Sequence, residues 1–249
     1  MSALVSFRHV SVAFGHRSIL HNFSLDVQAG ETLVLLGRSG SGKTTALKTV
    51  NGLIVPTSGE VVVEGIPTTA WDPIRLRRRI GYAIQEGGLF PHFTVADNVA
   101  LVPRLEQRPP ADVHARVTEL LNTVGLPADV FGKRYPKELS GGQRQRVGVA
   151  RALAADPPLL LFDEPFGKLD PVTRLDLQKE FLSLRRQLGK TAMFVTHDVR
   201  EALSLATRIA VMANGALEFV GTPQEFLQAG TPEAKAFLAC LEPLEVSCR

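Results

Sequence analysis

Eight residues near the N-terminus have the types and spacing of a phosphate-binding loop. Gly37-Arg38-Ser39-Gly40-Ser41-Gly42-Lys43-Thr44 fits the pattern G-x-x-x-x-G-K-[ST] and follows the apolar run Thr32 to Leu36. The glycines let successive backbone N–H groups point at phosphate oxygens, and a helix expected from about Lys43 directs its positive dipole end to the same place. We expect Lys43 to reach the β and γ phosphates and Thr44 to offer its hydroxyl to Mg²⁺. The alternative is a glycine-rich turn between a strand and a helix.

Two adjacent acids, Asp163 and Glu164, follow the apolar run Leu159-Leu160-Leu161-Phe162. α/β sheets place their chemistry at the carboxyl ends of strands, which is where these acids are expected. One carboxylate can hold the Mg²⁺ that bridges the β and γ phosphates, and the other turns elsewhere because side chains alternate along a strand. The alternative is a pair of acids that caps the next helix. Together with the phosphate loop, the pattern favours Asp163 as metal ligand and Glu164 as general base.

A third group, Leu139-Ser140-Gly141-Gly142-Gln143, precedes a helix expected from Arg144 to Leu153. Ser140 and Gln143 have the spacing of a capping box, which would start that helix without any ligand. Two glycines in a first helical turn cost roughly 1 kcal/mol each, however. We therefore expect a ligand to approach the backbone closely at this point.

The elements that position these residues can be read from the hydrophobic pattern. Alternation from about residue 4 to 29 predicts two antiparallel strands, and the unbroken apolar runs before the first two motifs predict buried parallel strands. Helical spacing between about Glu86 and Pro158 predicts a helical lobe inserted into a sheet domain. The remaining expectations are a strand at Glu60 to Val63, a helix at Pro73 to Arg79, strands at Ile80 to Ile84, Thr191 to Val195, Ile209 and Leu217, helices from Pro171 and Asp198, and one or two helices over Pro223 to Leu241.

Composition limits the classes of protein that remain. The 249 residues are 45% hydrophobic with a net charge of +3, and no apolar run reaches the ~18 residues that a membrane span needs. The first residues lack the apolar core of a secretion signal, so a cytosolic location is expected. A basic cluster, which could bind nucleic acid, is formed by Arg75, Arg77, Arg78 and Arg79. Low aromatic content and the absence of a recognition motif favour a solvated helix end, and no nucleic-acid partner is expected.

Together, the three motifs resemble those of the nucleotide-binding subunit of an ATP-binding cassette (ABC) transporter. Leu139 to Gln143 matches the most specific mark of that family, and Phe14, Gln85, Asp170 and His197 occupy further family positions in the expected order. The resemblance covers essentially the whole chain. It implies an α/β P-loop NTPase (RecA-like) core with a mostly parallel sheet, an N-terminal antiparallel β subdomain and an inserted α-helical subdomain. The single domain, 1–249, would comprise a core over 1–85 and 159–222, a helical signature subdomain over 86–158 and a helical tail over 223–249.

The resemblance also implies a role for each motif residue. Phe14 would stack on adenine, and the loop residues from Gly37 to Thr44, with Thr45, would bind ATP. Mg²⁺ would be held by Thr44, Gln85 and Asp163. Gln85, Glu164 and His197 would act in hydrolysis. Two copies would form a homodimer around two ATP, with Ser140 and its neighbours on the other copy's ATP and Asp170 at the dimer interface.

Two positions depart from the commonest family pattern. Phe14 replaces a tyrosine but keeps the stacking face, and Lys168 stands where the family usually has a small residue. The rival function class is an ABC ATPase of DNA repair, chromosome organisation or translation, which carries long insertions or two cassettes in one chain. A regulator that binds nucleotide without hydrolysing it would be expected to lack Glu164 or His197, and both are present.

The resemblance further implies partners and a substrate. With no membrane segment, the chain would act on integral-membrane permease subunits from the inner face of the membrane, and indirectly with a substrate-binding protein. The expected contact is the surface around Gln85 and Leu89-Phe90-Pro91-His92-Phe93, for which packing inside the helical lobe is the alternative. The stretches Arg78 to Gln85 and Gly88 to Val99, with Val102-Pro103, resemble those of importers of the osmoprotectants glycine betaine, choline, carnitine and proline. An importer of an amino acid or an oxyanion is the alternative, and regulatory modules beyond Arg249 are not expected.

Overall fold

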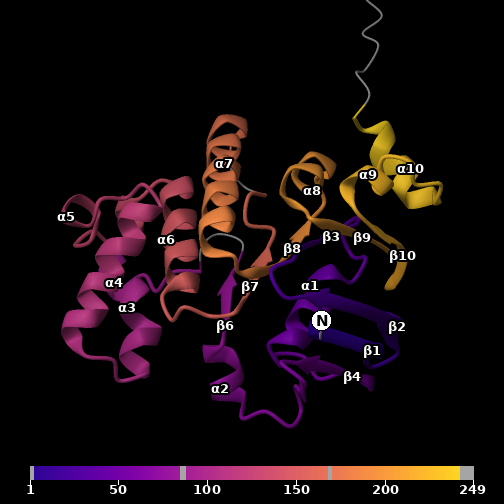
Figure 1. The fold of residues 1–249 in the computed structure, drawn as a ribbon, viewed down its shortest axis with the longest axis horizontal. Helices are drawn as coiled ribbons and strands as arrows, with labels where there is room; N and C mark the ends of the chain where they lie inside the picture. Colours follow the sequence, from indigo (N-terminus) through magenta and orange to yellow (C-terminus); the bar gives the residue numbers. More distant parts are fainter. Residues whose placement is uncertain (1–2, 85–87, 168–169, 242–249) are drawn as a thin grey trace, which may run out of the picture. The chain divides into compact units, whose positions relative to one another are not determined.

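A computed structural model of the chain describes residues 3–84, 88–167 and 170–241 (Figure 1). The chain divides into two compact units, Met1–Thr68 with Phe194–Arg249 and Thr69–Met193. Each unit is built around its own strands and helices. Strand β8 (Thr191–Thr196), along which the chain passes from the second unit into the first, is buried over its whole length.

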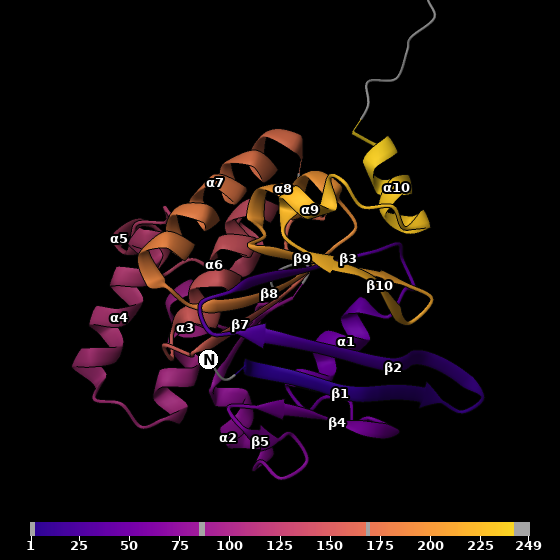
Figure 2. The same cartoon turned by 45° about the vertical axis from the view of Figure 1, so that its right-hand side comes forward.

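The first unit contains an antiparallel sheet formed largely by the N-terminal hairpin. Its strands β1 (Ala3–Phe14), β2 (Arg17–Gln28), β4 (Ser58–Val63) and β5 (Ile66–Pro67) lie in the order β2-β1-β4-β5 (Figure 2). The expected alternation holds along most of β1. Phe7 and Val10 are three positions apart, so a regular strand would point them to opposite faces, yet both are buried. A shift in register between them, with His9 at φ 49°, makes this possible. Phe7 packs edge to face on Phe23 at 5.0 Å between ring centroids.

The same unit also holds the strand that leads into the phosphate loop. All five residues of β3 (Thr32–Leu36) are buried, as expected for a strand covered on both faces, and β3 pairs in parallel with β9 (Arg208–Ala213). Strand β9 pairs antiparallel with β10 (Ala216–Gly221). The helices of this unit are α1 (Lys43–Val50), α8 (Val199–Leu205), α9 (Pro223–Phe226) and α10 (Pro232–Ala239).

The second unit combines two parallel strands with most of the helices. Strand β6 (Ile80–Ala83) pairs in parallel with β7 (Leu159–Asp163). The helices, which gather around these strands in Figure 1, are α2 (Pro73–Arg78), α3 (Val95–Leu105), α4 (Pro110–Thr123), α5 (Ala128–Phe131), the 3-10 helix η1 (Pro136–Glu138), α6 (Gly141–Leu153) and α7 (Pro171–Leu188). Val113, Val117, Leu120 and Leu121 form the buried face of α4, as their spacing predicts.

The start of α6 differs from the sequence expectation. Helix α6 begins at Gly141, three residues before Arg144, so both glycines of the third motif are helical. The physical reason is the cap that Ser140 supplies, because a hydrogen-bonded N-cap offsets part of the cost of glycine in the first turn.

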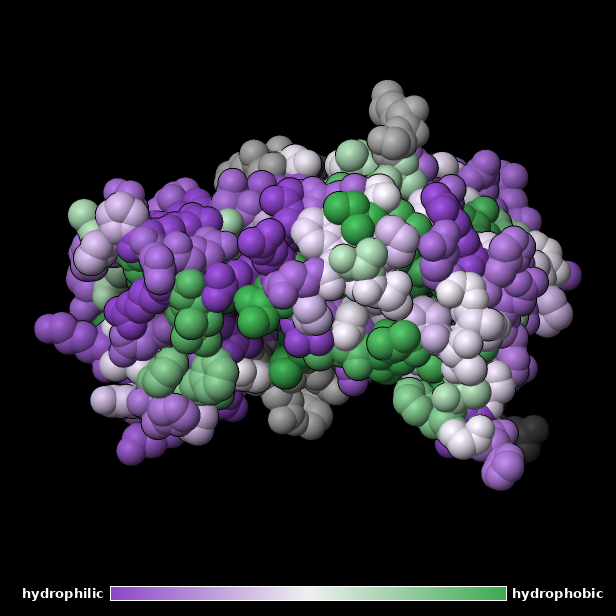
Figure 3. Space-filling model, turned by 90° about the horizontal axis from the view of Figure 1, so that it is seen from below, coloured by the Kyte–Doolittle hydropathy of each residue, from purple (hydrophilic) through white to green (hydrophobic). Residues whose placement is uncertain are grey.

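The face of the molecule drawn in Figure 3 carries both polar and apolar residues. In Figure 3, hydrophilic residues cover much of the end that carries α3 to α6, with small apolar patches between them. Within residues 3–84, 88–167 and 170–241, no helix has both the length and the apolar character needed to span a membrane.

Candidate functional site

The phosphate loop lies between β3 and α1, and its lysine is folded back over it. Lys43 is 4% exposed, and its Nζ donates hydrogen bonds to the backbone oxygens of Gly37 at 2.7 Å and Arg38 at 2.8 Å. These bonds hold the ammonium group against the turn of the loop. A fixed positive charge beside a helix N-terminus is an arrangement that suits a phosphate group.

The backbone at the start of α1 accepts only glycine. Gly42 is the N-cap residue with φ 99°, and a Cβ there would lie 2.8 Å from Leu20 Cδ2 and 3.0 Å from Ile19 O. Among the described residues, no side chain caps this helix. The side chain of Arg38 turns toward the C-terminal helix α10, where its Nε donates to Glu233 Oε1 at 2.6 Å. The first backbone N–H groups of α1 therefore receive no cap from a side chain of the described residues, and they suit the binding of an anion.

Two further motif residues lie in the same unit. Phe14 ends β1 and is 56% exposed, so its ring is available for stacking and it is not a strand core residue. His197 is exposed in the turn between β8 and α8. That turn is held by buried Thr196, whose Oγ1 donates to Glu201 Oε2 at 2.6 Å, and by Asp198, whose Oδ1 accepts from Arg200 N at 2.8 Å.

In the second unit, Asp163 ends β7 and Glu164 follows in a left-handed conformation with φ 46°. The Tyr82 hydroxyl donates to Asp163 Oδ2 at 3.3 Å. Burial, and then the charge of the Asp163 carboxylate, raise the pKa of Tyr82 well above its usual value, so the phenol stays protonated. Sequence reasoning did not single out Tyr82, because a bond between two strands leaves no mark in residue spacing.

The helix after the two acids is capped by a different residue. Thr173 N, in the first turn of α7, donates to Asp170 Oδ1 at 3.0 Å. Hydrogen bonds from Thr173 lower the pKa of Asp170, which is exposed and therefore ionised near neutral pH. The capping alternative for Asp163 and Glu164 does not apply to this end of α7, because Asp170 fills that role.

The third motif forms the capping box that was its alternative interpretation. Gln143 N donates to Ser140 Oγ at 3.2 Å, and Ser140 N donates to Gln143 Oε1 at 2.9 Å. A Cβ on Gly142 would lie 2.6 Å from Thr173 Cγ2, so this glycine allows α6 to approach the start of α7. Close approach of the backbone is therefore needed within the chain itself, whether or not a ligand binds. Leu139 is buried, whereas Ser140 and Gly141 are exposed.

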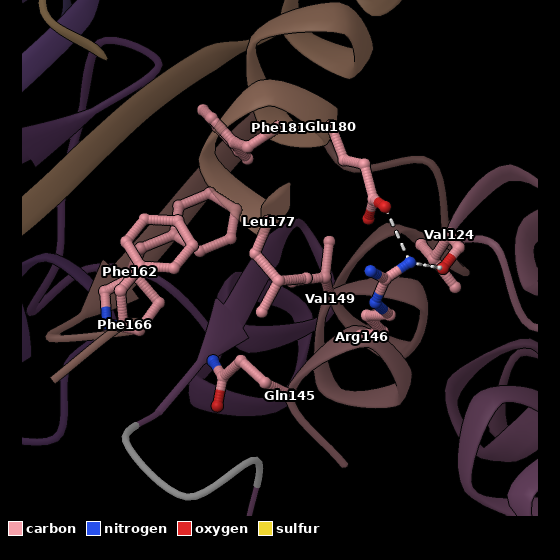
Figure 4. Close-up of a pocket in the computed structure, with 10 residues that line it drawn as sticks. Val124, Gln145, Arg146, Val149, Phe162, Phe166, Leu177, Glu180 and Phe181 are labelled. Carbon is pink, nitrogen blue, oxygen red and sulfur yellow. Dashed lines mark hydrogen bonds and ion pairs between the residues drawn. The ribbon is translucent and has the colours of Figure 1, made fainter. Parts of the chain in front are cut away.

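A small, largely apolar cavity of about 30 Å³ lies between α6, α7 and the end of β7 (Figure 4). At its edge Arg146 Nη1 contacts Glu180 Oε1 at 2.7 Å and Val124 O at 3.1 Å, and Phe162 packs edge to face on Phe181. Gln145 is 3% exposed, and its Nε2 makes no hydrogen bond within the part of the chain that the structure describes. The motif helix and the strand that ends at Asp163 thus contribute side chains to the lining of the same cavity.

The structure brings together only some of the predicted residues. In the first unit, hydrogen bonds hold Lys43 on its loop. In the second unit, Ser140 and Gln143 are hydrogen-bonded, and Gly142 lies against Thr173 in the first turn of α7. Gln85 and Lys168 lie outside the described residues, so their expected roles stay predictions.

Comparison with known proteins decides the family. A family model described as "ABC transporter" matches residues 20–167. The chain belongs to the ABC transporter family. The "Glycine betaine/carnitine/choline transport ATP-binding protein OpuCA" of Bacillus subtilis is 50% identical over 214 residues, which are 86% of this chain and 56% of that protein. The "Glycine betaine uptake system ATP-binding protein YehX" of Escherichia coli K12 is 48% identical, over 90% of this chain and 72% of the relative. The ABC chain spans little more than half the length of OpuCA.

A solved structure supports the fold assignment. The ATP-binding cassette MJ0796, solved as a dimer in a post-hydrolysis state bound to ADP and phosphate, is 34% identical to this ABC chain with a TM-score of 0.78. The match covers 88% of this chain and 98% of MJ0796. The predicted α/β P-loop NTPase fold and the resemblance to osmoprotectant ABC subunits are therefore confirmed.

Proposed function

We propose that this chain is the ATP-hydrolysing subunit of an importer for quaternary-ammonium osmoprotectants such as glycine betaine, choline or carnitine. The observation that carries the proposal is the 50% identity to OpuCA over 86% of the chain, which includes all three motifs. The phosphate loop and the acids at the end of β7 supply the local chemistry that such a subunit needs.

ATP is the substrate that the first unit suits. The exposed ring of Phe14 provides a flat apolar surface for adenine, and the loop from Gly37 to Thr45 provides backbone N–H groups for the phosphates. Lys43 keeps its ammonium group fixed on the loop, so little side-chain entropy is lost when a phosphate arrives.

The residues assigned to Mg²⁺ have the oxygen donors that this hard cation prefers. Thr44 offers a hydroxyl and Asp163 a carboxylate, with Gln85 proposed as a third ligand. When bound, Mg²⁺ neutralises charge on the β and γ phosphates. The fit of Asp163 rests on the position of its carboxylate at the end of β7, where Oδ2 accepts a hydrogen bond from the Tyr82 hydroxyl.

Hydrolysis needs a base and a contact for the γ phosphate. Glu164 is the proposed base that orients and deprotonates the attacking water, and it directly follows β7 in a left-handed backbone conformation with φ 46°. His197 is the proposed γ-phosphate contact. It is exposed on a turn whose flanking residues, Thr196 and Asp198, are held by hydrogen bonds.

A second copy of the chain is the proposed dimer partner. Ser140, Gly141 and Asp170 are exposed, and α6 presents its N-terminus on the same motif. A second helix N-terminus directed at the γ phosphate of the other copy would add positive potential there. Closure around two ATP and reopening after hydrolysis would then supply the motion that drives transport.

The permease is proposed to contact an aromatic cluster made of Phe90, His92 and Phe93. Phe90 is 42% exposed, and the ring centroids of His92 and Phe93 are 4.8 Å apart. Buried Asn98 holds the backbone beneath the cluster, since its Oδ1 accepts from Phe90 N at 2.8 Å. A groove of about 320 Å³ beside Phe90 is also lined by Arg77, Arg78 and Arg151. Through this contact the subunit would sit on the cytoplasmic face of the membrane, with a substrate-binding protein acting on the permease from outside.

ATP turnover by matched variants tests the proposed chemistry. Glu164→Gln should bind ATP normally and lose at least about 10²-fold of hydrolysis, because it removes a general base without changing side-chain size. Lys43→Ala should instead weaken ATP binding, because it deletes the charge next to the phosphates. Both are measured by nucleotide titration and phosphate release after reassembly with the permease. Near wild-type hydrolysis by the Gln variant would overturn the assignment of Glu164, and recovery of the chain with nucleic acid or ribosomes would favour the rival class.

A further inference from the structure

The Tyr82 side chain and the proposed metal ligand Asp163 meet on one face of a parallel strand pair. Tyr82 lies opposite Leu161 in the register of β6 and β7. Asp163 is two residues beyond Leu161, and side chains two apart on a strand point to the same face. The register therefore places both side chains on that face, and the Tyr82 hydroxyl donates to Asp163 Oδ2 at 3.3 Å.

The backbone that carries Tyr82 has little room to move. Its neighbour Gly81 packs against α6 so closely that a Cβ there would collide with Ala152 O. Ala83, on the other side, is fully buried and paired with Phe162. The strand thus fixes the position of the Tyr82 backbone. The tyrosine side chain is long enough to bring its hydroxyl to Asp163 at the end of β7.

A donor on one carboxylate oxygen restricts the rotation of the carboxylate. Metal-binding carboxylates are commonly oriented in this way by a partner that does not itself touch the metal. A phenol suits the task because it brings a hydrogen-bond donor and adds no positive charge beside the carboxylate.

We propose that Tyr82 is a positioning residue that holds the Asp163 carboxylate in the orientation in which it binds Mg²⁺. The proposal rests on the role given to Asp163 under the proposed function. Tyr82 acts through Asp163 alone, so its hydroxyl affects the metal-dependent part of nucleotide binding and leaves the metal-independent part unchanged.

Calorimetric titration of the full chain separates these two parts. ATP is titrated in EDTA, and Mg²⁺ is titrated into the protein at saturating ATP. Tyr82→Phe should weaken the apparent affinity for Mg²⁺ by about 10-fold, the lower end of the effect of removing such a partner. ATP affinity in EDTA and the melting temperature should stay at wild-type values. Tyr135→Phe is the matched control, because it deletes the hydroxyl of the chain's other tyrosine.

The outcomes distinguish the role of Tyr82 from the proposed role of Asp163, on which it rests. Unchanged Mg²⁺ affinity in Tyr82→Phe, with the affinity lost in Asp163→Asn, would overturn the role of Tyr82 and leave that of Asp163 intact. Unchanged Mg²⁺ affinity in Asp163→Asn would overturn the role of Asp163 itself. Equal weakening of ATP binding with and without Mg²⁺ in Tyr82→Phe would show that the hydroxyl only supports the fold, and would also overturn the inference.

Discussion

Lys43 shows how a single residue is prepared for a charged ligand. An ammonium group that is 4% exposed is stable only with hydrogen-bond partners, and two backbone oxygens of its own loop supply them. Phe14 is the opposite case, since its large apolar ring stays exposed on a polar hairpin where it gains little from burial. Both residues are explained better by a ligand than by the stability of the fold.

The exposed ring of Phe14 leads to a prediction about adenine. Phe14→Ala should lower ATP affinity by roughly 1 to 3 kcal/mol, the scale of base stacking on an aromatic side chain. Phe14→Trp should preserve affinity, and neither variant should lower the melting temperature much, because the ring is 56% exposed. Titration with ATP and with inorganic triphosphate checks the origin of the loss. An equal loss for both ligands would show that Phe14 does not contact the base.

At this scale, residues with fixed spacing could be found from the sequence and contacts between elements could not. The phosphate loop is a local pattern, so Gly37 to Thr44 could be assigned before any fold was known. The contact of Tyr82 with Asp163 could be found only from the pairing of β6 with β7. The place of Gln145 in the cavity could be found only from the packing of α6 and α7. Distances across strands and helices depend on register, which hydrophobic pattern alone does not fix.

At the scale of elements, the start of α6 has two roles. Ser140 caps the helix, and Gly142 lets it pack closely against α7. The hydrophobic pattern predicted most of the longer strands and helices, because buried faces impose periods of two or 3.6 residues. It missed the true start of α6 and the bulge at His9, both of which depend on single backbone conformations. The expected domain limits at residues 85, 158 and 222 stay a prediction.

The close approach of α6 and α7 predicts a rescue by a second substitution. Gly142→Ala places a methyl group 2.6 Å from Thr173 Cγ2, and should destabilise the chain by roughly 1 to 3 kcal/mol, the usual cost of overpacking. Thr173→Ser removes that methyl group and should restore much of the loss in the double variant. Urea denaturation of the single and double variants measures the coupling. Additive effects would show that the two residues do not meet.

An acidic side chain between helices gives a pH-dependent contribution to stability. Asp156 contacts Lys190 Nζ at 2.9 Å and Arg116 Nη2 at 3.7 Å. The hydrogen bond to Lys190, with the positive charges of Lys190, Arg116 and Arg108, lowers the pKa of Asp156. Its stabilisation is therefore present above the unfolded pKa of about 3.9 and is lost as pH falls through the lower folded pKa.

The matched variant for this prediction is Asp156→Asn, because asparagine tolerates the φ of 56° at this position. The variant should have a smaller free energy of unfolding at pH 7, by no more than a few tenths of a kcal/mol per ion pair, since the Asp156 side chain is 60% exposed. The difference should shrink as pH falls from 5 to 3. A difference that does not shrink as the pH falls would mean that charge is not its cause.

At the scale of the whole molecule, the residues proposed to bind and hydrolyse ATP are distributed over the two compact units. The phosphate loop, Phe14 and His197 belong to one, and Asp163, Glu164 and Ser140 belong to the other. Motif order along the chain was enough to identify the ABC family, because seven short patterns in sequence leave few alternatives. The solute proposed for the importer rests on resemblance alone, since under the proposed function it would be bound by partner proteins whose residues are not in this chain.

Uptake of labelled solute tests the central claim most directly. Cells that lack this chain and have no redundant betaine system are supplied with the wild type or with Glu164→Gln at equal expression, and uptake of labelled glycine betaine and choline is measured at high osmolarity. The account predicts that the wild type restores uptake and that Glu164→Gln lowers it by at least about 10²-fold, as loss of a general base requires. Unchanged uptake in cells without the chain, or full uptake with Glu164→Gln, would contradict the account.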